Sequence, residues 1–291
     1  MDYFLSVLIL VLIYIILATS LDIVFSNAGI FSVSHAAFFG IGALIYAIFS
    51  KLGSINYFVI IGIVILVTSV VAILIAVSTL RIKGDYFIIA SFGFQMIAYD
   101  IFYNWVRYTS GASVIYAIPR PTIFNITFDS VPKYLILVFS ITVICVFICW
   151  WLSHSPFGKL LRAIKGDDIA VQSSGRSPLV YKIEALVISG ILAAVAGVLY
   201  SGFLSIFVPG TYNVDLSISI VAMVIVGGSG NILGASLGAA VLVILPQVIT
   251  FLNLPTTIVG PLQQLLYGFL LIVFMRLRPG GLLNKRKQNA S

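Results

Sequence analysis

Side chains that could act as catalytic acids, bases or nucleophiles are sparse in this sequence. Two carboxylates are adjacent only at Asp167 and Asp168, beside Lys165, where solvation or pairing with the lysine is a simpler role than catalysis. The fragment nearest to a phosphate-binding P-loop, residues 158–160, lacks the earlier glycine and the Ser or Thr that should follow the lysine. Nucleophile-elbow and zinc-helix motifs are also absent. We therefore predict a chain with no catalytic residues.

Cysteine and histidine give no metal site either. Cys145 and Cys149 are four residues apart inside an apolar run, and we interpret them as small apolar residues on one helix face. His35 and His154 are far apart, so no Cys/His cluster has the spacing that a metal requires. We predict no metal and no cofactor bound by this chain.

The composition is that of a membrane protein. Of the 291 residues, 61% are hydrophobic and 9% are charged, and the mean hydropathy is +1.17. A soluble domain carries about 25% charged residues, and its core cannot hide so much apolar surface. The net charge of +7 comes from basic residues gathered in short segments, which indicates membrane topology rather than nucleic-acid binding. We predict an all-α polytopic membrane protein surrounded by lipid.

Apolar runs long enough to cross a bilayer, about 20 residues each, predict about eight or nine transmembrane helices. The seventh run, about 15 residues long, precedes the glycine-rich stretch 227–230, so it either crosses fully or forms a broken, re-entrant helix. Small residues at helical spacing, such as 190, 193, 194 and 197, predict close helix packing. The runs are 3–24, 29–50, 56–79, 86–104, 134–152, 183–205, 214–228, 233–252 and 262–277.

The distribution of basic residues predicts the orientation. With nine spans and the N-terminus outside, twelve Lys and Arg residues fall in inner segments and four in outer ones. The first run lacks a positive flank, so we expect it to remain as a span rather than to be cleaved as a signal peptide. We predict one transmembrane domain over 1–291, with an external loop at 105–133, a cytoplasmic loop at 153–182 and a cytoplasmic tail at 278–291.

Ionisable residues within the apolar runs are candidates for function, because burying a charge in lipid is costly. Asp22 lies near the inner end of the first span and Asp100 near the outer end of the fourth. Both are close enough to an interface to be hydrated, so a functional and a merely solvated role remain open. His35, between Ser34 and Ala36, is expected to be a hydrogen-bonded packing residue.

The loop that begins at Ser155 has an amphipathic pattern. Apolar residues recur at i, i+3, i+4 and i+7, and basic residues occupy the other faces, which predicts a helix at the inner membrane surface. Such a helix either rests on anionic lipid or docks a cytoplasmic partner, and the pattern alone does not choose. The apolar positions are Phe157, Leu160, Leu161 and Ile164, and the basic ones are Lys159, Arg162 and Lys165.

The same loop resembles the cytoplasmic coupling segment of LivM-type permeases from branched-chain amino-acid ABC importers. Further segments resemble that family in the same order: 29–43, 80–94, 218–238 and the Pro-Gly-Gly-Leu stretch 279–282. Asp22 stands where the family has Asn, and Gln95 where Glu is common, so the solute remains open. The matching coupling positions are Gly158, Arg162, Ala163, Ile164, Lys165, Asp168, Ala170 and Gly175.

The resemblance implies a bacterial or archaeal plasma-membrane importer with ATP used by partner subunits. Its partners would be a second homologous permease, forming a heterodimer, two cytoplasmic ABC ATPases and an extracellular or periplasmic solute-binding protein. Branched-chain amino acids, urea, amides or other amino acids would be carried. Residues implied in ATPase coupling are Gly158, Lys159, Arg162, Lys165, Asp168, Ala170 and Gly175; those implied in the substrate pathway are Gly29, Ser34, His35, Gly40, Gly42, Gln95, Gly227, Gly228 and Gly230.

The alternative from a different class is a proton-coupled secondary transporter with Asp22 or Asp100 as proton carrier. The two classes differ in whether transport survives ATP depletion while the proton gradient is intact.

Overall fold

The computed structural model describes residues 2–52, 56–80, 86–110, 114–123 and 126–250, together with the single positions 262, 265, 268, 269 and 272. This part of the chain is a bundle of helices with one two-stranded hairpin. In chain order the elements are α1 (Asp2–Asp22), the π-helical turn η1 (Ile23–Asn27), α2 (His35–Lys51), α3 (Tyr57–Thr79), α4 (Tyr86–Ser110), β1 (Thr122–Ile123), β2 (Ile126–Thr127), α5 (Val131–His154), α6 (Pro156–Gly166), α7 (Asp168–Ser173), α8 (Pro178–Leu204), the 3-10 turn η2 (Pro209–Thr211), α9 (Val214–Gly227) and α10 (Ile232–Thr250).

Six helical segments of the described residues are long and apolar enough to cross a membrane, which confirms a multi-pass membrane protein. Helices α2 and α10 are shorter apolar helices, so the predicted total of eight or nine spans is not established by length alone. The predicted ninth span, 262–277, and the tail after it lie almost wholly outside the described residues. The six segments are Asp2–Asn27, Tyr57–Thr79, Tyr86–Arg107, Val131–His154, Pro178–Leu204 and Pro209–Gly227.

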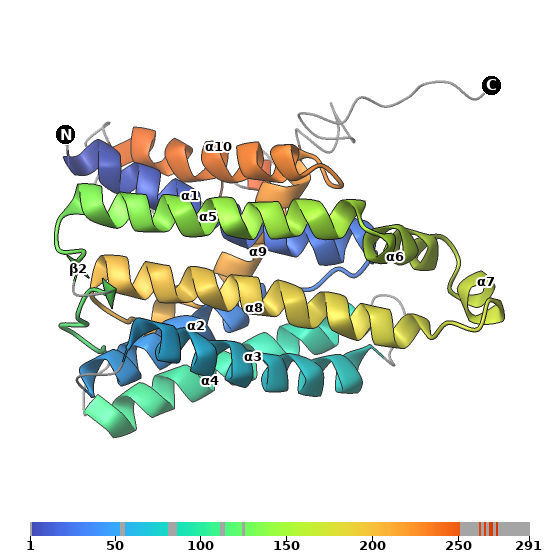
Figure 1. The fold of residues 1–291 in the computed structure, drawn as a ribbon, viewed down its shortest axis with the longest axis horizontal. Coiled ribbons are helices and arrows are strands. Elements are labelled where there is room, and N and C mark those ends of the chain that lie inside the picture. The colour runs from blue at the N-terminus through green and yellow to red at the C-terminus, as the bar shows by residue number, and fades with distance from the viewer. Residues whose placement is uncertain are drawn as a thin grey trace.

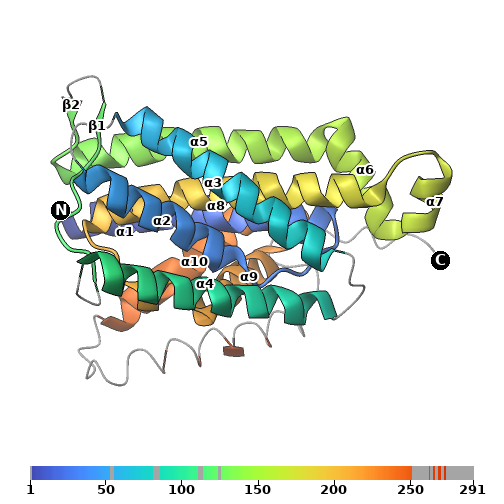
Figure 2. The same ribbon diagram turned by 90° about the horizontal axis from the view of Figure 1, so that it is seen from below.

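The two ends of the bundle differ. The N-terminal end of α1, the β1–β2 hairpin and the start of α5 lie at one end, and α6 and α7 protrude from the other (Figures 1 and 2). Helix α8 runs between α5 and α3 and packs against α1, α2 and α3. The basic loop predicted at 153–182 is thus mostly helical, because α6, α7 and the first turn of α8 occupy it.

Small residues allow the helices to approach closely, as predicted. A Cβ atom at Gly42 would lie 1.9 Å from the carbonyl oxygen of Ala194, and one at Gly197 would lie 2.0 Å from that of Phe39. These two contacts join α2 to α8 backbone against backbone. Helices α9 and α10 meet in the same way, since a Cβ at Gly238 would lie 2.0 Å from the Met223 carbonyl.

The second apolar run, 29–50, begins with a non-helical segment. Helix α2 starts only at His35, and residues 28–34 form no helix. Gly29 adopts a left-handed φ of +69°, which ends the preceding π-turn and redirects the chain. The segment 28–34 then runs back into the bundle before α2 starts (Figures 1 and 2).

Candidate translocation and coupling site

The buried start of α2 is the first part of the candidate site. Residues of 28–34 are mostly buried, so the free backbone amides of this segment and of the first turn of α2 need partners other than water. Side chains from two other helices supply them. Ser91 of α4 accepts from the amide of residue 33 at 3.1 Å, and Ser217 of α9 accepts from that of residue 36 at 3.0 Å. Three chain segments far apart in sequence therefore meet at this helix end.

Gln95 connects the same three helices. Its Oε1 accepts from the Ala37 amide at 2.7 Å and from the Ser217 hydroxyl at 3.3 Å. Its Nε2 donates to the Tyr212 carbonyl at 2.9 Å, and the side chain is fully buried. An amide suits this position because it offers an acceptor and a donor at once.

His35 lies beside the same helix end and contacts α1. Its Nε2 is 2.8 Å from the Ser20 hydroxyl, and that hydroxyl is also 2.9 Å from the Leu17 carbonyl. The donor in the His35–Ser20 contact depends on the tautomer of the imidazole. This arrangement is the packing role expected for His35. Ser34, also predicted in the pathway, hydrogen-bonds Ser32 at 2.9 Å.

Asp22 ties the end of α1 to the connection between α9 and α10. Its Oδ1 accepts from the Gly230 amide at 3.0 Å and also from the Ser26 hydroxyl. The Asp22 side chain is buried, and Gly230 holds a φ of +88°. Asp100, the other ionisable candidate, is exposed on α4.

Helix α6 is attached to the π-turn η1 by its two inner basic residues. Lys165 Nζ donates to the Ser26 carbonyl at 3.1 Å, and Arg162 Nη1 donates to Asn27 Oδ1 at 3.1 Å. Arg162 also donates to the Ser153 carbonyl at 3.0 Å. A Cβ at Gly29 would lie 2.8 Å from Lys165 Cγ, so only glycine leaves room for this lysine. Arg162 and Lys165 thus have hydrogen-bond partners within this chain, while both residues remain exposed.

The other predicted coupling residues divide into inner and outer positions. Gly158 allows α6 to turn tightly under α5, since a Cβ there would lie 2.4 Å from the Leu152 carbonyl. Asp168 forms an ion pair of 2.8 Å with Lys182. Lys159, Ala170 and Gly175 are exposed, and Gly175 has a φ of +78° at the turn after α7.

The predicted pathway glycines have several structural roles. Gly40 faces the Phe102 ring, where a Cβ would approach to 2.4 Å, and Gly42 is the contact with Ala194 described above. Gly227 packs on Gly234, with a Cβ-to-carbonyl distance of 2.0 Å. Gly228 has a φ of +105° and, with Gly230, shapes the α9–α10 connection.

Sequence reasoning missed the serines at 91 and 217, the Tyr212 carbonyl and Asn27. Ser91 and Ser217 could have been predicted as buried hydrogen-bonding residues, because each is a polar residue inside an apolar run and lipid gives such groups no partner. The role of the Tyr212 carbonyl could not, because every residue has a backbone carbonyl.

Six helical segments that can cross a membrane, a buried non-helical segment before α2 and an amphipathic helix held at one end define a multi-pass membrane protein. The family described as "Branched-chain amino acid transport system / permease component" matches residues 3–275, and the chain belongs to it. It is thus the non-catalytic membrane subunit of an ABC importer.

Curated relatives agree. The LivM permease protein of the high-affinity branched-chain amino acid transport system from Salmonella typhimurium is 27% identical over 295 residues, covering 94% of this chain and 68% of that protein. Its Escherichia coli counterpart is 27% identical over 297 residues, with the same coverage of both chains. The ribose import permease protein RbsC of Haemophilus influenzae is 29% identical over 114 residues, covering 37% of this chain and 35% of that protein. No solved structure matches this chain.

Proposed function

We propose that this chain imports branched-chain amino acids, or a related small polar solute, across a bacterial or archaeal plasma membrane. The match of residues 3–275 to the permease family carries this proposal. The relatives named for branched-chain amino acids match 94% of this chain, and the one named for ribose matches 37%, so branched-chain amino acids are the favoured solutes. The N-terminus would lie outside and the C-terminus inside, since the basic α6–α7 end of the bundle then faces the cytoplasm.

The chain would act with a second homologous permease, two cytoplasmic ABC ATPases that use the ATP, and an external solute-binding protein. Helix α6 with α7 would be the coupling element. Lys159 of α6 and Ile169 of α7, the latter 73% exposed, would contribute to the surface that meets an ATPase. An exposed isoleucine on α7 and an exposed lysine on α6 suit a partner surface with apolar and acidic groups.

Motion would pass from α6 into the membrane through contiguous contacts. Lys165 donates a hydrogen bond to the Ser26 carbonyl, and the Ser26 hydroxyl donates one to the Asp22 carboxylate. The Asp22 carboxylate also accepts a hydrogen bond from the Gly230 amide. A push on α6 therefore reaches both α1 and the α9–α10 connection without crossing lipid. Discrete contacts between rigid helices are the means by which such displacements travel.

The pathway would lie beside the non-helical segment 28–34 and the start of α2. Irregular backbone at membrane depth is tolerated where protein surrounds it or where it lines a cavity, and it commonly forms transporter sites. Ser34, His35 and Gln95 would shape this region, and Gly29, Gly228 and Gly230 would let its ends flex. Gly40, Gly42 and Gly227 would serve it by holding the surrounding helices close.

Co-purification tests the assignment. The chain is expressed with its neighbouring transport subunits, solubilised mildly and analysed by mass spectrometry, as wild type and as Lys159→Glu/Ile169→Asp. We expect ATPases with the wild type and a large loss with the double variant. Lys133→Glu, an exposed charge reversal at the start of α5, is the matched control and should retain the ATPases.

If the wild type retains no ATPase under conditions that preserve a known importer, and uptake follows the proton gradient, the importer assignment is wrong. If ATPases stay bound to the double variant, the importer stands and the docking surface is wrong.

A further inference from the structure

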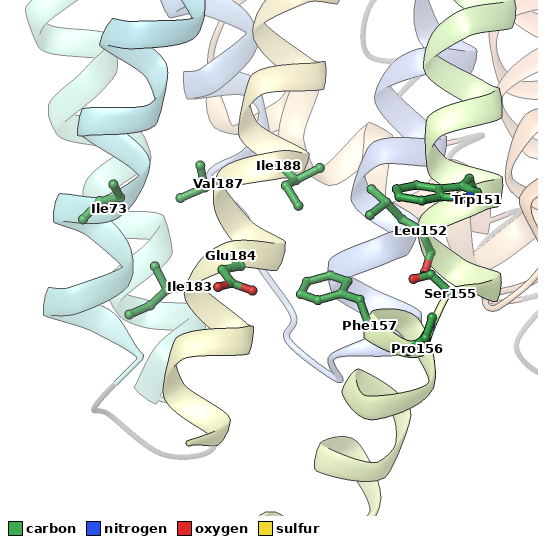
Figure 3. A pocket seen from close by; sticks show the side chains of 10 residues that line it. All are labelled: Ile73, Trp151, Leu152, Ser155, Pro156, Phe157, Ile183, Glu184, Val187 and Ile188. Atoms are coloured by element: carbon green, nitrogen blue, oxygen red, sulfur yellow. The ribbon is translucent and has the colours of Figure 1, made fainter. Parts of the chain in front are cut away.

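An apolar cavity lies at the α6 end of the bundle, outside the proposed pathway. It has a volume of about 570 Å³ and is bounded by α3, α5, α6 and α8 (Figure 3). Ile73, Trp151, Phe157 and Val187 form its walls. The volume falls within the range of roughly 300–1,000 Å³ that is usual for small-molecule sites.

The cavity is accessible from the bilayer. Ile73 is 45% exposed on α3 and Trp151 is 59% exposed on α5, and both helices qualify as membrane spans. These exposed apolar faces belong to helices that can span a bilayer, so a lipid can enter the cavity from the side. Water is a poor occupant, since an apolar cavity does not offer the two to four polar partners that a buried water needs.

The cavity contains one carboxylate, that of Glu184 (Figure 3). Within the described part of the chain, Glu184 is exposed and its carboxylate forms no hydrogen bond or ion pair. The neighbouring cation, Lys182, is held by Asp168 at 2.8 Å. Glu184 is six residues into α8, about 9 Å along the helix at 1.5 Å per residue, which places it near the membrane interface.

A carboxylate at that depth, above an apolar cavity, matches an amphiphile with a cationic head. Charged groups in a span are unfavourable unless they are paired or hydrated. A primary ammonium both neutralises a carboxylate and donates hydrogen bonds to it, whereas a quaternary ammonium has no hydrogen to donate. Trp151 at the rim is the residue type that favours the headgroup level.

We propose that this cavity binds one phospholipid with a primary-amine headgroup, with an acyl chain against Val187 and Ile73 and the ammonium on Glu184. Phe157 of α6 forms part of the wall, so the lipid touches the helix that also holds η1. The site is independent of the transported solute, and its test does not require transport.

Native mass spectrometry of the full chain within its purified complex tests the site. The complex is delipidated and titrated with phosphatidylethanolamine and phosphatidylcholine that carry identical acyl chains. We expect the wild type to favour the ethanolamine lipid by about tenfold, which is the ratio expected for one hydrogen bond to a charged group. Glu184→Gln should reduce the ratio to about one, and Asp129→Asn, which removes an exposed carboxylate elsewhere, should leave it unchanged.

A second variant tests the chain-binding part. Val187→Trp fills the cavity and should reduce adducts of both lipids, while gel filtration confirms an intact complex. The proposal is overturned if the wild type does not distinguish the two lipids, or if Glu184→Gln keeps the wild-type ratio. It is also overturned if the isolated chain binds the lipid but the assembled complex does not, because a neighbouring subunit then fills the cavity.

Discussion

Replacing Gln95 with leucine should destabilise the protein by removing the junction of α2, α4 and α9. Leucine keeps the approximate size but leaves the Tyr212 carbonyl without its donor, and an orphaned buried polar group costs about 1–3 kcal/mol. The Ala37 amide loses its bond to Gln95 but keeps its hydrogen bond to the Ser34 carbonyl at 3.1 Å. Losing the bond to Gln95 therefore costs less, about 0.5–1.5 kcal/mol. The expected total is about 2–4 kcal/mol.

Thermal unfolding of the detergent-solubilised chain measures this loss. For a chain of this size, 1 kcal/mol corresponds to a shift in Tm of about 2–4 °C, so Gln95→Leu should lower Tm by about 5–15 °C. Gln95→Glu, as the neutral acid, retains one acceptor and one donor and should lose less. Gln172→Leu, an exposed glutamine on α7, is the control and should change Tm little. A Tm for Gln95→Leu equal to that of the control would refute the reasoning.

Two further predictions concern packing and orientation. Gly42→Ala should severely impair folding or expression, because the new Cβ would overlap the Ala194 carbonyl. Gly62→Ala is the control and should be tolerated, because nothing lies within 4 Å of a Cβ at Gly62. Equal expression and equal Tm of the two variants would contradict the packing account. A cysteine at Asp129 should react with a membrane-impermeant maleimide on intact cells, and one at Ser174 only after permeabilisation; the reverse pattern would invert the proposed orientation.

Composition and periodicity were sufficient to predict an all-helical membrane protein and an amphipathic helix after Ser155. The apolar pattern predicted an amphipathic helix after Ser155, and α6 spans Pro156–Gly166, where Ser155 caps the first turn and Pro156 is tolerated because its missing amide needs no partner. The sequence around Gly42 suggests close helix packing, but it does not show that the residue packed against Gly42 is Ala194. Such contacts depend on tertiary packing rather than on local pattern.

The site was predicted only in part. The local sequence does not reveal the partners of the amides at residues 33, 36 and 37, because these partners are Ser91, Ser217 and Gln95 on distant helices. The hydrogen bond from Lys165 to the Ser26 carbonyl was also hidden, because a basic residue on an amphipathic helix is usually solvated. Glu184 was overlooked for a related reason: its significance lies in the cavity around it and not in its neighbours along the chain.

The central claim is that this permease is driven by ATP and that α6 transmits the motion through η1. The most direct measurement is the number of ATP molecules hydrolysed per solute imported by the purified complex in proteoliposomes. Lys165→Met removes the donor to the Ser26 carbonyl and should leave ATP hydrolysis largely intact while uptake falls, so the ratio should rise several-fold. Arg176→Met, an exposed basic residue after α7, should leave the ratio unchanged. An unchanged ratio in Lys165→Met, or uptake without ATP, would contradict the account.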